Sequence, residues 1–179
     1  MKTVVLFFAL LFALWACSES TDPNYDNDIA KIDSLDVKSA IGLANEWKFT
    51  NSKISSHVTT EELIIEFPDG RKVKKTLPPN ERYIAVAPYI ISTHDCSTHY
   101  PSSCDAELKE KTFKLTAKDT HGNTLFDGNI TSMKNGFFEL WLPRDLTITL
   151  HVEYNSLFAD EIIGTFATNK TCITTVKLK

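Results

Sequence analysis

The amino-acid sequence predicts a mainly β protein, in which an antiparallel β-sandwich domain follows a short N-terminal segment of one helix and one β-hairpin. Three observations support this fold class. Helical periodicity is confined to residues 29–47. Beyond them, apolar residues recur at every second position, which is the period of a strand with one buried face. The strand-like runs recur about every 8–12 residues between turns, a cadence typical of transthyretin-like or immunoglobulin-like sandwiches.

The first 16 residues have the features of a bacterial export signal. Lys2 precedes an unbroken apolar run over residues 4–15. That run is shorter than the roughly 20 apolar residues of a membrane-spanning helix, and it fits the core of a signal peptide. Leu14-Trp15-Ala16-Cys17 resembles a bacterial lipobox, although Trp15 is bulky for its position. We predict a lipoprotein signal peptide over residues 1–16 with lipidation of Cys17; plain secretion with Cys17 as an ordinary thiol is the alternative.

Residues 17–28 are expected to form a flexible tether between the lipid and the fold. They are rich in Ser, Thr, Asp and Asn, contain Pro23 and lack periodicity. Ser18, directly after the cysteine, suits sorting to the outer membrane. We therefore expect a periplasmic protein attached to a bacterial membrane, preferentially the outer membrane, through acyl chains on Cys17.

Residues 29–79 are predicted to form an N-terminal segment with a helix and a hairpin. Ser34 is the expected N-cap of the helix, after a short turn at residues 29–32, and Gly42 weakens the middle of the helix. Its apolar face consists of Leu35, Val37, Ala40, Ile41, Leu43, Ala44 and Trp47.

Three strands are predicted to follow the helix, over residues 53–60, 62–67 and 71–77. The last two are joined by Pro68-Asp69-Gly70, in which Pro presets φ, Asp caps locally and Gly accepts a positive φ. Pro78-Pro79-Asn80 interrupts the pattern, so we place the boundary to a C-terminal domain there.

The domain over residues 80–179 is predicted to be the β-sandwich and to carry a cysteine and histidine site. Its first strand spans residues 81–91, in which Pro88 indicates an edge or a bend. Residues 93–108 have neither helical nor strand period, and long ordered loops of this kind are often functional. Further strands are predicted over residues 112–118, 124–129, 136–142, 146–154, 158–166 and 172–178.

The charge balance argues against a nucleic-acid partner. Lys2 is the one charged residue among residues 1–16, so the rest of the chain has 18 basic and 23 acidic residues. The one basic run, Arg71, Lys72, Lys74 and Lys75, falls on a hairpin arm, where a solvated face explains it. An acidic chain without a basic face is a poor candidate for nucleic-acid binding.

Four candidate metal ligands lie within eleven residues of the long loop. They are His94, Cys96, His99 and Cys104, and Cys172 starts the last predicted strand. Thiolates supported by imidazoles suit Cu(I), and they suit zinc as well. Asp95 is a hard donor and is expected to orient a histidine instead.

Other readings of these residues remain open. Three cysteines in an oxidising compartment allow one intramolecular disulfide and leave one thiol over. A Cys96–Cys104 staple with Cys172 buried and inert is one alternative, and a cysteine nucleophile with His94 or His99 as its base is another. His57, His121 and His151 fall away from the cysteines and are expected to have no role in the site.

Two blocks of sequence resemble the CueP family of bacterial copper-resistance proteins. The first is Arg82-Tyr83-Ile84-Ala85-Val86-Ala87-Pro88-Tyr89 followed by Thr93-His94-Asp95-Cys96, His99 and Cys104. The second comprises Asn135-Gly136-Phe137, Leu140-Trp141-Leu142-Pro143-Arg144-Asp145 and the ending Thr171-Cys172-Ile173-Thr174. The resemblance runs from about residue 35 to the C-terminus. The lipobox and the Ser97-Thr98 and Tyr100-Pro101 neighbours of His99 depart from the family pattern.

The resemblance implies a periplasmic copper-binding protein for copper tolerance, with Cys96, Cys104 and Cys172 as its key residues. It further implies thiol redox exchange, reduction of Cu(II), copper supply to a Cu,Zn superoxide dismutase, and a homodimer assisted by the N-terminal part. We therefore predict a copper site at these three cysteines with His94 or His99, and a periplasmic thiol reductant as a partner. The alternatives are a disulfide-stapled envelope interaction or structural domain, and a metal-independent thiol oxidoreductase.

Overall fold

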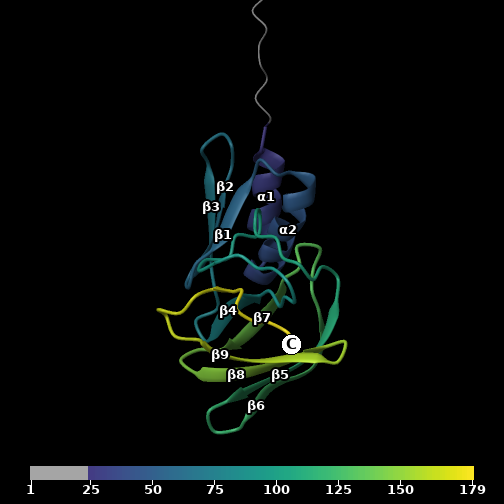
Figure 1. Ribbon diagram of the computed structural model, residues 1–179. Coiled ribbons are helices and arrows are strands. Elements are labelled where there is room, and N and C mark those ends of the chain that lie inside the picture. The colour runs from purple at the N-terminus through teal and green to yellow at the C-terminus, as the bar shows by residue number, and fades with distance from the viewer. Residues whose placement is uncertain (1–23) are drawn as a thin grey trace, which may run out of the picture.

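The computed structural model describes residues 24–179, and it has the predicted mainly β architecture (Figure 1). Over these residues, two helices precede ten strands in three sheets. The signal peptide, Cys17 and most of the expected tether lie outside the described residues. Within residues 24–179, no helix combines the length and apolar character needed to span a membrane.

The predicted helical stretch consists of two helices, α1 (Asp26–Ser34) and α2 (Val37–Thr50). Asp36, rather than the expected Ser34, caps α2: its carboxylate accepts hydrogen bonds from the Ser39 backbone N–H at 3.0 Å and the Ser39 hydroxyl at 2.6 Å. α1 begins three residues inside the expected tether. Acidic Asp26 and Asp28 in its first turn favour this start, because they oppose the positive end of the helix dipole.

The hairpin region forms an antiparallel sheet of β1 (Ser55–Val58), β2 (Glu62–Glu66) and β3 (Lys72–Thr76). Apolar side chains of this sheet, including Leu63 and Ile65, share a buried core with Ile41 and Trp47 of α2. Lys72 and Lys74 are exposed and pair with acidic residues of β2 at 2.8 and 2.9 Å. The expected solvated arm is thus present except at Lys75, which is half-buried and donates to the Asp33 and Leu35 carbonyls.

The sandwich packs a three-stranded sheet against a four-stranded sheet. The smaller sheet has the order β10 (Cys172–Ile173), β4 (Glu81–Val86), β7 (Phe138–Pro143). The larger sheet has the order β6 (Thr124–Thr131), β5 (Thr112–Asp119), β8 (Thr147–Tyr154), β9 (Leu157–Gly164). The core between the sheets includes Ile84, Leu140, Leu115 and Leu150. The predicted sandwich is confirmed.

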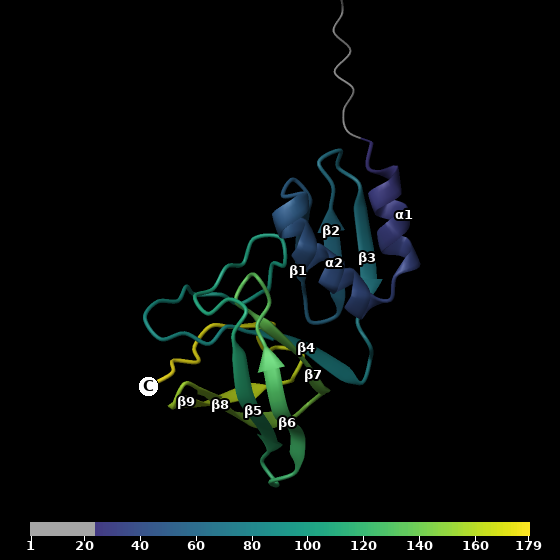
Figure 2. The same ribbon diagram turned by 90° about the vertical axis from the view of Figure 1, so that its right-hand side faces the viewer.

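Strand β4 is buried on both faces. Ile84 and Val86 face the sandwich core, whereas Tyr83 and Ala85 contribute to the core shared with the helices and hairpin. The smaller sheet therefore lies between the N-terminal segment and the larger sheet, as Figures 1 and 2 show. This explains why β4 is apolar at consecutive positions rather than at alternate ones.

The strands β4 and β10 both end well before the predicted residue, and one proline accounts for both differences. β4 ends at Val86 instead of residue 91, because Pro88 has no N–H to donate to a neighbouring strand. The parallel partner β10 consequently stops at Ile173, and the two segments rejoin only at an isolated bridge between Tyr89 and Lys177. Pro88 marks a bend, and β4 is the central strand of its sheet.

Candidate metal centre

The loop between β4 and β5 is fastened to the free edge of β1. The Val58 N–H donates to the His99 carbonyl at 2.8 Å, and the Ser56 and Ser102 hydroxyls exchange hydrogen bonds with each other's backbone N–H. At the start of the loop, the Glu107 carboxylate accepts from three consecutive backbone N–H groups, those of residues 90–92. These contacts hold a long segment without secondary structure in one conformation.

Thr171 ties the last strand to the same loop. Its hydroxyl donates to the Val58 carbonyl at 2.8 Å and accepts from the His99 N–H at 3.0 Å. Its backbone N–H donates to the Ser97 carbonyl at 3.0 Å. Ser97 directly follows Cys96, and Thr171 directly precedes Cys172. This pairing therefore brings the two cysteines together.

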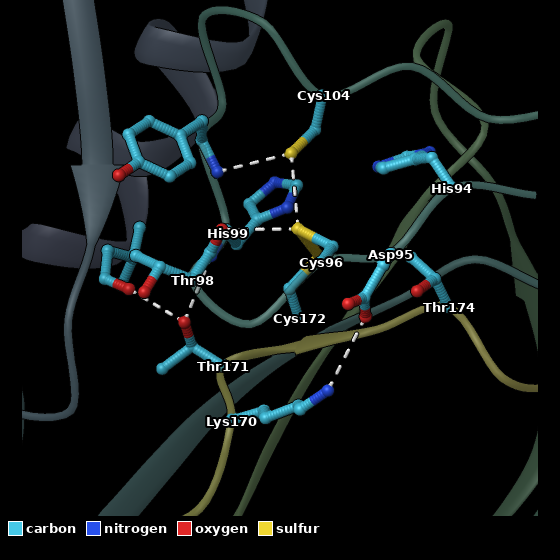
Figure 3. The surroundings of a disulfide bond; sticks show 12 residues. His94, Asp95, Cys96, Thr98, His99, Cys104, Lys170, Thr171, Cys172 and Thr174 are labelled. Atoms are coloured by element: carbon cyan, nitrogen blue, oxygen red, sulfur yellow. Dashed lines mark hydrogen bonds and ion pairs between the residues drawn. A yellow bond between two sulfur atoms is a disulfide. The ribbon is translucent and has the colours of Figure 1, made fainter.

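The three cysteines converge on one place, with Cys96 and Cys172 joined in a disulfide (Figure 3). The free thiol is Cys104, whose Sγ lies 3.8 Å from the Cys96 Sγ. The Cys96–Cys104 staple considered from the sequence is therefore wrong. Loop pairing sets Cys96 opposite Cys172, at a Cα–Cα distance of 5.7 Å across 76 residues of sequence.

The Cys104 thiol is nearly buried, at 7% exposed. Burial raises the pKa of this thiol, while the Tyr100 N–H that donates to its sulfur at 3.3 Å and the nearby Lys48 ammonium act in the opposite direction. The Lys48 ammonium donates to the Cys104 carbonyl at 2.6 Å and to an Asp105 carboxylate oxygen at 2.5 Å. α2 thus holds the backbone that carries this cysteine.

His99 is fully buried, and neither of its ring nitrogens has a hydrogen-bond partner. The ring packs against Phe137 at 4.8 Å and Tyr83 at 6.1 Å between centroids. Burial lowers the pKa of His99 to about 3, and the positive charge of Lys48 contributes, so its imidazole is neutral. Buried nitrogens without partners carry a desolvation cost that a metal ion would offset.

The donor atoms form two groups with metal-site spacing. The donor atoms of His99, Cys104 and Cys172 lie within 4.8 Å of one another, and so do those of His94, Cys96 and Cys104. His94 is exposed, and its ring lies beside the sulfurs in Figure 3. A surface pocket of about 610 Å³ opens onto the second group, lined by His94, Asp95, Cys96, Ser97, Thr98, Tyr100, Ser103, Cys104 and Asp105.

Asp95 and the remaining histidines lie outside these groups. The Asp95 carboxylate points to Lys170, 3.6 Å away, so the expectation that it orients a histidine is wrong (Figure 3). It is 95% exposed and meets a solvent-facing lysine instead. His57 stacks on Tyr100, His121 lies in a turn, and His151 pairs with Asp160 on the larger sheet.

A buried polar network beneath His99 was missed from the sequence. Glu139 accepts hydrogen bonds from the Tyr83 hydroxyl and the Asn45 side-chain amide, both at 2.8 Å, and Asn135 donates to Asn45 at 3.0 Å. Burial raises the pKa of Glu139, and burial next to that carboxylate raises the pKa of Tyr83 well above its usual value. The available signal was a glutamate between Phe138 and Leu140, on a strand otherwise apolar there.

Comparisons with known proteins identify the family to which this chain belongs. A search of curated proteins finds no match. A crystal structure of "S.CueP" matches with a TM-score of 0.79 and 26% sequence identity, over 89% of this chain and 100% of that chain. The family model described as "Periplasmic copper-binding protein CueP" matches residues 41–177, which include every cysteine and histidine of the two donor groups. The chain belongs to the CueP family of periplasmic copper-binding proteins.

Proposed function

We propose that this protein confers copper tolerance by binding copper as Cu(I) at Cys96, Cys104 and Cys172, with a histidine completing the site. The observation that carries the proposal is His99: a neutral, buried imidazole without a hydrogen-bond partner beside three converging sulfurs. Thiolates and imidazole are soft to intermediate donors, which Cu(I) prefers over harder oxygen donors. Zinc accepts the same donors and is the competing ion.

The disulfide suggests how Cu(II) would be reduced in the pocket. Two thiols, Cys96 and Cys172, lose two electrons and two protons as their S–S bond forms, and two Cu(II) ions each gain one electron to become Cu(I). Cys104 keeps its thiol throughout and remains a ligand. This assignment uses the cysteine pair that lies in a disulfide within residues 24–179.

Resetting the pocket requires an external dithiol reductant. Cys96 is half-buried and lines the surface pocket, whereas Cys172 is fully buried. A reductant thiolate would attack the Cys96 sulfur, and Cys172 would leave as the thiolate, since exchange depends on which sulfur is accessible. A second thiol of the reductant then releases Cys96 and leaves three reduced cysteines.

The cellular setting completes the proposal. Cys17 carries the lipid that attaches the protein to the periplasmic side of a bacterial membrane, preferentially the outer membrane. Its partners are a periplasmic thiol reductant and a copper client such as a Cu,Zn superoxide dismutase, and two chains associate through the N-terminal segment. These elements rest on the sequence pattern and the family resemblance.

One alternative has a specific observation in its favour. The 3.8 Å between the Cys104 and Cys96 sulfurs suits thiol–disulfide exchange without metal. A metal-independent oxidoreductase would reduce or oxidise substrate disulfides in copper-free buffer at the rate seen with copper. A disulfide-stapled structural domain would instead keep its disulfide under mild reductants.

The test is an anaerobic titration of the chain from Ser18 to Lys179, which retains both hydrophobic cores and lacks Cys17. Fully reduced protein is titrated with Cu(I) against a competing chelator, and free thiols are counted before and after. We expect tight binding of one copper and protection of all three thiols. Failure to compete with the chelator, together with closure of two thiols into a reduction-resistant disulfide, would favour the structural domain. Tighter binding of Zn²⁺ than of Cu(I) would make zinc the ligand.

A further inference from the structure

We infer that the reduced pocket offers two overlapping copper positions that share Cys104, an outer one where copper arrives and an inner one where it is held. The outer position comprises His94, Cys96 and Cys104, and the inner position comprises His99, Cys104 and Cys172. The inference rests on the proposed function and assigns different tasks to the two histidines.

The two donor groups are distinct but have one common member. Each group keeps its three donor atoms within 4.8 Å of one another, and only Cys104 belongs to both. His94 and His99 both lie beside the sulfur cluster (Figure 3), and both rings contact Phe137, at 6.2 and 4.8 Å between centroids. A single Cu(I) ion bound to Cys104 therefore has two alternative pairs of further donors, His94 with Cys96 or His99 with Cys172.

Solvent reaches the two groups unequally. All three outer residues line the 610 Å³ surface pocket, whose lining includes neither His99 nor Cys172. His99 and Cys172 are both 0% exposed. An ion from solution thus meets the outer group first, because His99 and Cys172 of the inner group are closed to solvent.

The inner group gains more from the ion. The His94 imidazole is exposed and exchanges water for copper when it binds. The His99 nitrogens are already stripped of water and have no protein partner, so coordination supplies the missing interaction. Copper is therefore expected to move inward, exchanging His94 for His99 and gaining Cys172, while Cys104 stays bound and Cys96 completes the three-sulfur site.

The disulfide controls both positions at once. It joins Cys96 of the outer group to Cys172 of the inner group. The oxidised chain therefore leaves Cys104 as the one free thiol of the three cysteines and completes neither group. Two electrons and two protons from a dithiol reductant restore both groups together.

Histidine variants separate arrival from retention. The reduced chain from Ser18 to Lys179 is mixed with Cu(I) in a stopped-flow instrument and then challenged with chelator. His94→Ala should slow loading about 10-fold and leave the Kd nearly unchanged, whereas His99→Ala should load normally and release copper about 10–100-fold faster, the range typical of perturbed metal sites. His57→Ala is the matched control, because His57 stacks on Tyr100 near the pocket but belongs to neither group.

A measurement on the unmutated chain guards against a folding defect in His99→Ala. Histidine-¹⁵N NMR at one Cu(I) equivalent should shift a ring nitrogen of His99 and leave those of His94 unchanged. A shift at His94 alone, or equal kinetic effects of both variants, would overturn the two-position order while copper binding stands. If the reduced chain does not bind Cu(I) at all, the proposed function fails with it.

Discussion

The Cys104 thiol lies 3.8 Å from the Cys96 sulfur that is bonded to Cys172, so the free thiol and the disulfide occupy one site. Three sulfurs from two distant stretches of the chain meet there because the loop and Thr171, next to the last strand, bond to each other and both bond to Val58 of β1. The arrangement makes Cys104 the only one of the three that keeps a thiol in both redox states. The following predictions depend on this arrangement.

Cys104→Ser should abolish most Cu(I) binding and leave the fold intact. Cys104 belongs to both donor groups, and a hydroxyl is a poor ligand for a soft ion. Ser103→Ala is the control, because Ser103 lines the same pocket and belongs to neither group. Chelator competition measures the stoichiometry, and non-reducing mass analysis checks that the Cys96–Cys172 disulfide still forms. Unchanged copper stoichiometry in Cys104→Ser would show that Cys104 is no ligand.

Thr171→Val should lower the free energy of unfolding by about 1–3 kcal/mol, because it leaves the Val58 carbonyl and the His99 N–H without their buried partner. Urea unfolding measures this loss. Thr174→Val is the control: Thr174 is also buried, but its hydroxyl makes no hydrogen bond within residues 24–179. Equal losses in the two variants would mean that Thr171 acts only by packing.

Gly136→Ala should destabilise the protein more than Gly70→Ala. Both glycines have a positive φ, +85° and +87°, so alanine is strained at each by about 1–2 kcal/mol. At Gly136 the added Cβ would also lie 2.6 Å from the Ala106 carbonyl oxygen, whereas at Gly70 it meets nothing within 4 Å. The difference in Tm between the two variants measures the effect of the close contact, because the backbone strain is common to both. A Tm for Gly136→Ala at or above that of Gly70→Ala would contradict it.

Glu139 should make the metal-free protein less stable as the pH rises. Burial raises the pKa of this carboxyl, so its stabilising contribution is present below the unfolded value near 4.5 and is lost as the pH rises through the folded pKa. Glu139→Gln keeps a carbonyl oxygen to accept from Tyr83 and Asn45 but cannot ionise.

Urea unfolding between pH 4 and 8 therefore compares the free energies of unfolding of the wild type and Glu139→Gln. The variant should gain stability over the wild type as the pH rises, with little difference at pH 4. The exposed Glu153→Gln should not reproduce this trend, because hydrogen bonding to Lys114 lowers the pKa of Glu153. Parallel pH profiles for wild type and Glu139→Gln would exclude a buried, titrating carboxyl.

Local patterns were sufficient to predict most of the fold. The alternation of Ile148, Leu150 and Val152 gave β8 because one face of that strand is buried in the sandwich. The start of α1 was missed, since Tyr25 and Ile32 are buried by tertiary contacts rather than marked by a strong local period. The length of the last strand depended on Pro88 in a different segment, a relationship absent from its own residues.

The residues of the candidate site could be predicted from the sequence, but the disulfide pairing and the burial of each histidine could not. His94, Cys96, His99 and Cys104 stand close together in sequence, so their convergence required only a folded loop. The disulfide pairing required the contact of Thr171 with Ser97, across 74 positions of chain. His99 is buried against Tyr83 from β4 and Phe137 from the segment before β7, whereas His94 contacts Phe137 and stays exposed.

X-ray absorption spectroscopy at the copper edge tests the central claim most directly. The reduced chain from Ser18 to Lys179 is loaded with one equivalent of copper under argon and measured beside the double variant His94→Ala/His99→Ala. The account predicts an edge characteristic of Cu(I), a first shell dominated by sulfur, and the outer-shell scattering of one imidazole that is lost in the double variant, because each donor group contains one of these histidines. A first shell of nitrogen and oxygen without sulfur, or an imidazole signal unchanged in the variant, would contradict it.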